Sequence, residues 1–297
     1  MTQPDPGRAE MLEDGLRRIL APNPGPMTHW GTNTFIVGEG RVAVLDPGPD
    51  HPGHLADILA ATRGETITHI VVTHAHLDHS PLARRLSKRT GAPVLGFGPP
   101  GAGRSATMSA LAGEGLAGGG EGVDTAFAPD ATLADGDRVT GDGWQIEALH
   151  TPGHFAGHLA FAFQGTLISG DHVMDWSSSL VSPPDGDLGA FMATSARLRD
   201  AGHRRLYPGH GGAIDDPSGR LGWLIAHRAA REAGILNALG PAPLEIAEIA
   251  RRVYTDIPPA MLPAAGRNVF AHLVDLHERG LVRATPRLGA TARFALV

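Results

Sequence analysis

Three histidines and one aspartate lie within six residues, and this cluster constrains the fold and the chemistry of the chain more than any other feature. His74, His76, Asp78 and His79 directly follow the apolar run 70–72, which predicts a buried strand. Side chains two positions apart on an extended chain point to the same side, so His74 and His76 can hold one ion together. Neutral imidazole and carboxylate groups are ligands that suit zinc. The cluster therefore predicts a metal site at the end of a strand.

The chain that follows the cluster is expected to turn directly into a helix. Ser80 has the character of an N-cap residue and Pro81 suits the first helical position, which predicts a helix that continues through Leu86. Asp78 and His79 would then lie in the turn between strand and helix, with their side chains directed back toward the end of the strand.

The composition excludes several other kinds of site and location. The 297 residues include no cysteine, so neither a disulfide nor a thiolate ligand can contribute. A formal net charge of −6 argues against a protein built mainly to coat nucleic acid. No apolar run approaches about 18 residues, and the N-terminus lacks the apolar region of a secretory signal. We therefore expect no membrane span and a soluble, cytoplasmic protein.

Together with four further motifs, the cluster resembles the signature of the metallo-β-lactamase superfamily. The pattern His74-x-His76-x-Asp78-His79 is similar to the signature itself. The further motifs are Asp46 in Val-Leu-Asp-Pro-Gly, His154 in Thr-Pro-Gly-His, Asp171 in Ser-Gly-Asp-His and His210 in Tyr-Pro-Gly-His-Gly. Five motifs in the order of the family are far more specific than the cluster alone.

The resemblance implies an α/β fold, namely the four-layer αβ/βα metallo-β-lactamase sandwich with metals at one edge between two sheets. The residues agree, because predicted strands and helices alternate in two similar halves. The first half contains a predicted hairpin at 34–45, a helix at 54–61 and a strand at 66–73. The second half contains strands between residues 138 and 168 and a helix at 188–199.

The resemblance also implies a centre of two metal ions. The matching ligands are His74, His76 and His154 for the first zinc, Asp78, His79 and His210 for the second, and Asp171 as the bridge between them. Two Zn²⁺ are expected, although iron or manganese could occupy the same ligands. Asp78 and Asp171 are also the carboxylates with implied catalytic roles, and the nucleophile would be a hydroxide shared by the two ions.

Two further residues are expected to support this centre rather than to bind metal. Asp46 matches a motif position that usually orients a ligand histidine. His158 follows His154 in the pattern His-x-x-x-His, and we interpret it as a buried structural or supporting residue rather than a catalytic one.

Asp171 narrows the class of enzyme. A bridging aspartate is similar to the glyoxalase II, lactonase and ribonuclease branches of the superfamily, whereas the zinc β-lactamases proper lack that bridge. One major group of those lactamases uses a cysteine ligand, which this chain cannot supply.

Two stretches outside the motifs show little of the periodicity that predicts helices or strands. Residues 1–26 are Pro-rich and polar, with a short amphipathic piece around Leu16, Ile19 and Leu20. Residues 99–122 are rich in Gly and Ala, which predicts a loop with one short helix near 108–111. We favour a surface insertion over a functional lid for this loop.

After residue 219 the pattern changes to a small unit that is largely helical. The predicted elements are helices at 221–239, 244–254 and 268–279, and strands at 281–283 and 293–297. This arrangement resembles a winged helix, so we divide the chain into a metallo-β-lactamase-like catalytic domain, 1–219, and a winged-helix-like domain, 220–297. The charges on the third helix are mixed, which favours a module that packs beside the active site over one that reads DNA.

The layout as a whole resembles the lactamase-β-like-2 group, whose mitochondrial member is a single-strand endoribonuclease. Segments 227–236 and 268–273 carry this resemblance. It implies that the C-terminal module lies beside the metal cleft, with Arg228, Arg231 and His272 as candidates to face the substrate. A planar guanidinium suits carboxylate or phosphate. The alternative is that both arginines are solvated or pair with nearby acids.

These observations favour a dinuclear zinc hydrolase that attacks an ester, thioester or lactone of a small molecule. The alternative is a metal-dependent endoribonuclease that acts on single-stranded RNA. A third hypothesis, a nucleic-acid-binding winged helix with the first domain as scaffold, conflicts with the complete ligand set. The acidic first domain and the single lysine, Lys88, favour a small-molecule partner over RNA, whereas the group resemblance favours RNA. The substrate itself stays open, as does the formation of a homodimer.

Overall fold

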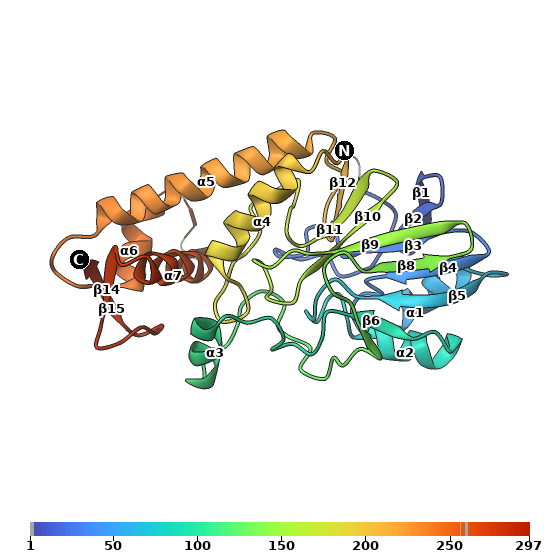
Figure 1. The fold of residues 1–297 in the computed structure, drawn as a ribbon, viewed down its shortest axis with the longest axis horizontal. Helices are drawn as coiled ribbons and strands as arrows, with labels where there is room; N and C mark the ends of the chain where they lie inside the picture. The colour runs from blue at the N-terminus through green and yellow to red at the C-terminus, as the bar shows by residue number, and fades with distance from the viewer. Residues whose placement is uncertain (1–2, 256, 259–260) are drawn as a thin grey trace.

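Two β-sheets packed face to face form the larger part of the molecule (Figure 1). The computed structural model describes residues 3–255, 257–258 and 261–297. The first sheet has its seven strands in chain order: β1 Ala9–Glu13, β2 Leu16–Leu20, β3 Asn33–Val37, β4 Arg41–Leu45, β5 Thr66–Val71, β6 Val94–Gly96 and β7 Ala131–Thr132. The second sheet runs in the order β12 Leu206–Pro208, β11 Thr166–Gly170, β10 Leu159–Phe163, β9 Trp144–His150 and β8 Arg138–Gly141.

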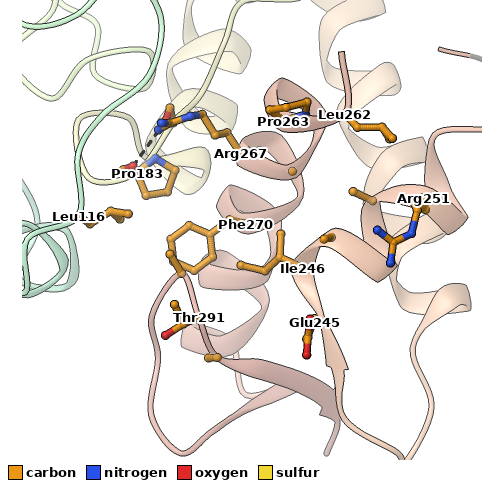
Figure 2. A pocket seen from close by; sticks show the side chains of 16 residues that line it. Leu116, Pro183, Glu245, Ile246, Arg251, Leu262, Pro263, Arg267, Phe270 and Thr291 are labelled. Atoms are coloured by element: carbon orange, nitrogen blue, oxygen red, sulfur yellow. Dashed lines mark hydrogen bonds between the residues drawn. The ribbon is translucent and has the colours of Figure 1, made fainter. Parts of the chain in front are cut away.

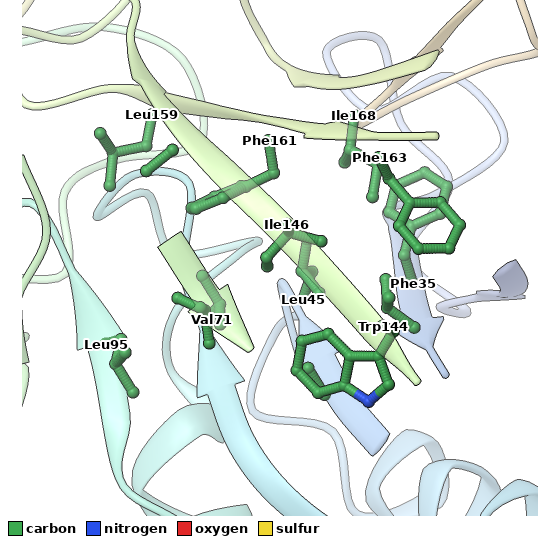
Figure 3. Close-up of a cluster of buried hydrophobic side chains, with 14 of the residues drawn as sticks. Phe35, Leu45, Val71, Leu95, Trp144, Ile146, Leu159, Phe161, Phe163 and Ile168 are labelled. Carbon is green, nitrogen blue, oxygen red and sulfur yellow. The ribbon is translucent and has the colours of Figure 1, made fainter. Parts of the chain in front are cut away.

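The main hydrophobic core lies between these two sheets. Inward-facing side chains of the first sheet, such as Phe35, Leu45 and Val71, meet Phe161 and Ile168 of the second (Figure 3). All five are almost completely buried. Burial of a large apolar side chain contributes about 1.5–3 kcal/mol, so this layer holds the two sheets together and fixes the edge at which their loops meet.

Helices cover the outer face of each sheet. On the first sheet, α1 (Pro52–Ala61) and α2 (Leu82–Thr90) bury Ile58 and Leu86 against the strands. On the second sheet, α4 (Leu188–Asp200) and α5 (Pro217–Ala238) bury Leu198 and Leu221 in the same way. The four layers confirm the predicted αβ/βα sandwich.

A small C-terminal lobe follows, built around α6 (Ile246–Val253) and α7 (Leu262–Glu278). Its three-stranded sheet has the order β13 (Leu244–Glu245), β15 (Arg293–Leu296), β14 (Val282–Thr285). In Figure 1 the long α5 runs from the sandwich to this lobe. Within the described part of the chain, no helix is both long and apolar enough to cross a membrane.

Helix α5 contributes side chains to two separate cores. Leu221 and Leu224, near its start, are fully buried against the second sheet. Ile235, near its end, is fully buried in the core of the C-terminal lobe. Helix α5 spans the predicted boundary between residues 219 and 220 and serves both cores. The division of the chain at this point therefore stays a prediction.

Several local predictions were wrong, each for an identifiable reason. Residues 9–20 form the paired strands β1 and β2, whose alternation is masked by charged residues on the edge strand. Ser80 does not cap α2, because the helix begins one residue later than expected, at Leu82, and the Ser80 hydroxyl donates to the carboxylate of Asp124 at 2.8 Å. Helix α7 begins six residues earlier than expected, with Pro263 in its first turn.

Candidate metal centre

Seven buried side chains converge at the edge of the sandwich, and they form two overlapping groups. The first group is His74, His76, His154 and Asp171, and the second is Asp78, His79, Asp171 and His210. Within each group the potential ligand atoms all lie within 4.8 Å of one another. Asp171 belongs to both groups, which is the position expected for a shared carboxylate. The structure thus brings together all seven residues that the sequence predicted as ligands.

The ends of strands place these side chains at one edge. His74 and His76 follow β5, Asp171 follows β11, and His210 follows β12. Strands β11 and β12 are parallel, so their carboxyl ends open at the same edge. Ligands of open α/β sheets commonly bind outside the carboxyl ends of the strands, and the loop between β9 and β10 adds His154 to this edge.

Gly209 is required by the close approach of two ligands. A Cβ atom at this position would lie 2.3 Å from Oδ1 of Asp171 and 2.8 Å from Cε1 of His79. Any side chain at Gly209 would therefore push the carboxylate of Asp171 away from its partners.

The second group has the charge balance of a cation site. Nε2 of His210 lies 3.0 Å from Oδ2 of Asp78 and 3.3 Å from Oδ2 of Asp171. Burial alone would lower the pKa of His210, but these two carboxylates overcome that effect and raise it to about 10. The same balance raises the pKa of His79 well above its usual value. Two buried carboxylates attract positive charge here, which fits a divalent ion.

The first group holds three imidazoles whose ring nitrogens face one another. Nε2 of His74 lies 2.9 Å and Nε2 of His154 lies 3.1 Å from Nδ1 of His76. Burial, followed by the neighbouring His154, lowers the pKa of His76 to about 3. Burial likewise holds the pKa of His74 well below its usual range. Neutral imidazole nitrogen is a good zinc ligand, and a cation between converging lone pairs removes their mutual repulsion.

Hydrogen bonds on the far side of each ring fix which nitrogen faces the centre. Nδ1 of His154 donates to the carbonyl of Leu180 at 2.7 Å, and Nδ1 of His210 donates to that of Gly31 at 3.1 Å. In both rings Nε2 is then left for a metal. Oδ1 of Asp78 is buried and has no hydrogen-bond partner in the described part of the chain. The donor set therefore fits two divalent ions.

Asp46 orients His79 and anchors the strand end, as the sequence predicted for a supporting residue. Its carboxylate accepts from the backbone N–H of Thr73 at 2.7 Å, from the hydroxyl of Thr73 at 2.7 Å, and from Nδ1 of His79 at 2.9 Å. The last contact leaves Nε2 of His79 directed at Asp171, 3.3 Å from Oδ1.

His158 supports Asp171 through the backbone. Nε2 of His158 accepts from the backbone N–H of Asp171 at 3.1 Å, and Nδ1 therefore donates to the hydroxyl of Thr151 at 2.7 Å. The ring is fully buried, which agrees with its interpretation as a supporting residue. Sequence reasoning did not identify Thr73, Thr151 or the carbonyls of Gly31 and Leu180, because such contacts leave no pattern in residue type.

We expect Asp46→Asn to lower turnover about 10–100-fold, and to lower the affinity of the second ligand group for its metal ion by a similar factor. This is the usual cost of changing a residue that orients a ligand. The amide can still accept from Thr73, but its NH₂ group would face Nδ1 of His79 and force the ring to present the wrong nitrogen. Metal titration of the purified variant tests this. Thr68→Val, which removes a hydroxyl bonded to the carbonyl of Val42 and to Nδ1 of His69, each at 3.0 Å, serves as a control of similar size. An unchanged metal affinity in Asp46→Asn would contradict the orienting role.

The cleft above the two groups has a volume of about 230 Å³. Its wall combines Met27, Met174 and Trp176 with Glu121 and Asn268. Burial, and then the charge of Asp78, raises the pKa of Glu121 above its usual value. The prediction that loop 99–122 is a surface insertion was therefore wrong for the last residues of the loop, because Gly120 and Glu121 line this cleft.

The three C-terminal candidates for substrate contact do not line the cleft. Arg228 is 1% exposed and donates to the carbonyl of Ser179 and to Oδ1 of Asn268. His272 is also 1% exposed, within the lobe. Arg231 lies over the ring of Tyr254, 4.3 Å from its centroid. Because Ser179 and Asn268 do line the cleft, Arg228 supports its wall from behind.

Comparison with known proteins agrees with this geometry. Residues 27–210 match the metallo-beta-lactamase superfamily, and residues 246–290 match the beta-lactamase associated winged helix domain. The chain is 31% identical to the beta-lactamase-like protein 2 homolog of Drosophila melanogaster, over 92% of this chain and 91% of that protein. It is 27% identical to the atrochrysone carboxyl ACP thioesterase of Claviceps purpurea, over 78% of this chain and 67% of that protein.

Solved structures show the same architecture. A metallo-beta-lactamase family protein from Thermus thermophilus superposes with a TM-score of 0.76 at 26% identity, covering 97% of this chain and 100% of that chain. A beta-lactamase domain protein from Burkholderia ambifaria gives a TM-score of 0.80 at 21% identity, covering 100% of this chain and 95% of that chain, and shares the fold. This chain therefore belongs to the metallo-beta-lactamase superfamily and is a metal-dependent hydrolase with a dinuclear His/Asp site and a C-terminal winged helix.

Proposed function

We propose that this chain hydrolyses an ester, thioester or lactone of a small molecule, with zinc at both metal positions. Bound divalent ions would lower the pKa of a water molecule and polarise the substrate carbonyl. The residues of the chain hold the ligands in fixed tautomers, and Met27, Met174 and Trp176 keep one side of the cleft apolar. A substrate that covers these apolar side chains would displace water from around its carbonyl, which strengthens electrostatic interactions there.

The observation that carries this proposal is the charge of the cleft wall. Among the described residues that line the metal cleft there is no arginine and no lysine, and Glu121 adds a carboxylate. The two ions would attract the phosphate that reacts, but the neighbouring phosphates of a strand would meet Glu121 and no cationic side chain in the cleft wall. Phosphate recognition normally uses Lys and Arg. An uncharged acyl group meets no such barrier. The name of the Claviceps purpurea relative, a thioesterase, supports the same reaction class.

A second candidate function, cleavage of single-stranded RNA, is favoured by one feature outside the cleft. Trp223 is 47% exposed and stacks on His227 at a centroid distance of 5.0 Å, with the guanidinium of Arg220 4.4 Å from its ring. Exposed aromatic rings beside cations are typical of surfaces on which bases stack. This surface lies on α5 rather than in the cleft wall.

One experiment separates the two candidates. A single metal-loaded preparation is assayed on a panel of thioesters and lactones and on labelled single-stranded RNA at several salt concentrations. We expect turnover of a thioester or lactone that changes little with salt. RNA cleavage that falls steeply with salt, without thioester or lactone turnover, would overturn the proposal, because each neutralised phosphate releases counterions.

We expect the active protein to contain about two zinc ions per chain, since each of the two ligand groups suffices for one ion. Elemental analysis of the purified protein measures this directly. Removal of metal with a chelator should abolish turnover, and zinc should restore it. Full activity with one ion or none would contradict the dinuclear assignment, and restoration by iron or manganese alone would correct the choice of metal.

A further inference from the structure

The metal cleft is too small to hold the whole of an ordinary substrate. Its volume of about 230 Å³ lies below the range of about 300–1,000 Å³ that is usual for small-molecule sites. Asn268 and Ala264 of α7 face this cleft. Leu262, Gly266 and Phe270 of the same helix line a second and larger cavity of about 870 Å³. We call this second cavity the α6–α7 groove.

The α6–α7 groove has an apolar floor and a polar rim. Phe270 and Ile246 project into its centre, while Glu245 and Arg251 stand at its edge (Figure 2). Leu116 and Pro183 face them from the catalytic side (Figure 2). Such a combination suits an apolar body with few polar atoms.

A narrow crevice lies between the metal cleft and this groove. Leu180, Gly119 and Ser182 line the crevice together with the ligands His76 and His154. Leu180 and the two histidines also line the metal cleft, and Ser182 also lines the α6–α7 groove. The three spaces are therefore neighbours that share wall residues, with the crevice between the other two.

Two glycines allow the backbone on one side of this crevice to approach the side chains of Ser182 and Asp185 closely. A Cβ atom on Gly118 would lie 1.6 Å from Oδ2 of Asp185, and one on Gly119 would lie 2.9 Å from Oγ of Ser182. The crevice has no room for a water molecule in this structure. A slender chain could pass only if the glycine segment shifts, which residues without side chains allow.

We propose that the α6–α7 groove binds the apolar acyl body of the substrate, whose chain passes through the crevice to place its carbonyl at the metal cleft. This inference rests on the proposed function as an ester or thioester hydrolase. It assigns the C-terminal lobe a direct part in substrate selection. Binding energy gained at a part of the substrate that does not react can position the carbonyl and so raise the rate of the chemical step.

The matched variants Gly266→Leu and Gly222→Leu test this assignment. Gly266 lies in α7 at the groove, and its nearest neighbour would be Cγ2 of Ile246, 3.9 Å from an added Cβ, so a leucine side chain would enter the groove. Gly222 lies in α5 with nothing within 4 Å of an added Cβ, so it is the control. Leucine is a better helix former than glycine, and thermal unfolding should show that both variants are folded.

The assay uses metal-loaded full-length protein and N-acetylcysteamine thioesters from acetyl to decanoyl. For wild type and Gly222→Leu, kcat/KM should rise roughly three- to fourfold for each methylene that is buried. Gly266→Leu should lower kcat/KM for the decanoyl thioester at least about tenfold while leaving the acetyl thioester within about twofold, since several methylenes lose their contacts. Turnover of acetyl thioester with no dependence on chain length in wild type would overturn the groove assignment.

Calorimetric titration with decanoate provides a readout without turnover. Wild type and Gly222→Leu should bind decanoate, and Gly266→Leu should bind it at least about tenfold more weakly. Decanoate binding of this pattern without turnover of any ester, thioester or lactone would overturn the proposed function and leave the groove assignment standing. Equal binding to all three proteins would overturn the groove assignment.

Discussion

Replacing Asp171 with alanine is expected to lower turnover more than about 100-fold, because residues that only orient a ligand already cost about 10–100-fold. Oδ2 of Asp171 lies 3.3 Å from Nε2 of His210 and 3.7 Å from Nε2 of His154, and so faces both metal groups. Its loss removes negative charge from each group, and bound zinc should fall below two ions per chain. Turnover and elemental analysis of the same sample measure both effects.

The variant should remain folded, because the core strand β11 ends at Gly170 and Asp171 takes no part in the hydrophobic layer. Asp142→Ala, at the exposed turn between β8 and β9, provides a control of the same chemical change. Full metal content together with near-normal turnover in Asp171→Ala would exclude its role as the shared carboxylate.

Deletion of residues 220–297 is expected to prevent the catalytic domain from folding, although every predicted metal ligand precedes residue 211. The deletion removes nearly all of α5, whose Leu221 and Leu224 are fully buried against the second sheet. Their burial accounts for about 3–6 kcal/mol, a large share of the 5–15 kcal/mol that is typical for a whole domain. Circular dichroism of the recovered fragment, together with its metal content, measures the outcome.

Two point variants at neighbouring positions of α5 in the full chain test whether the buried face of this helix stabilises the catalytic domain. Leu224→Ala should lower the free energy of unfolding by about 2–5 kcal/mol, as is usual for a buried leucine. Trp223→Ala, one residue earlier but 47% exposed, should change it by less than about 1 kcal/mol. A fragment 1–219 that folds and binds two metal ions would support the predicted boundary after residue 219 and contradict this interpretation of α5.

The parts of the molecule that the sequence predicted well depend on short-range patterns. The cluster of His74 and His76 directly follows the apolar run that forms the end of β5, and the hairpin at 34–45 follows from two short apolar runs separated by Gly38 and Gly40. The convergence of His154, Asp171 and His210 on the cluster was predicted only through the resemblance to a family. Nothing in the local sequence of these residues reveals that three distant strand ends meet at one edge.

The parts that the sequence did not predict depend on tertiary contacts. Arg228 was a candidate to face the substrate because of the group resemblance and because a guanidinium suits carboxylate or phosphate. Its guanidinium is instead enclosed between Phe191, Ser179 and Asn268. Residues 118–122 carried no periodicity, because their glycines serve close approach to Ser182 and Asp185 rather than a regular element. Such roles are defined by the neighbours of a residue and not by its own type.

The cleft wall is shared between two stretches of chain that lie far apart in sequence. All predicted metal ligands lie between residues 74 and 210, whereas Met261, Ala264 and Asn268 contribute to the cleft wall from α7 and the residue before it. Mutations in α7 can therefore alter which molecules fit without disturbing the reactive centre. Over evolutionary time, a gene with this arrangement can acquire new substrates by drift or recombination in its last quarter while the chemistry encoded upstream is preserved.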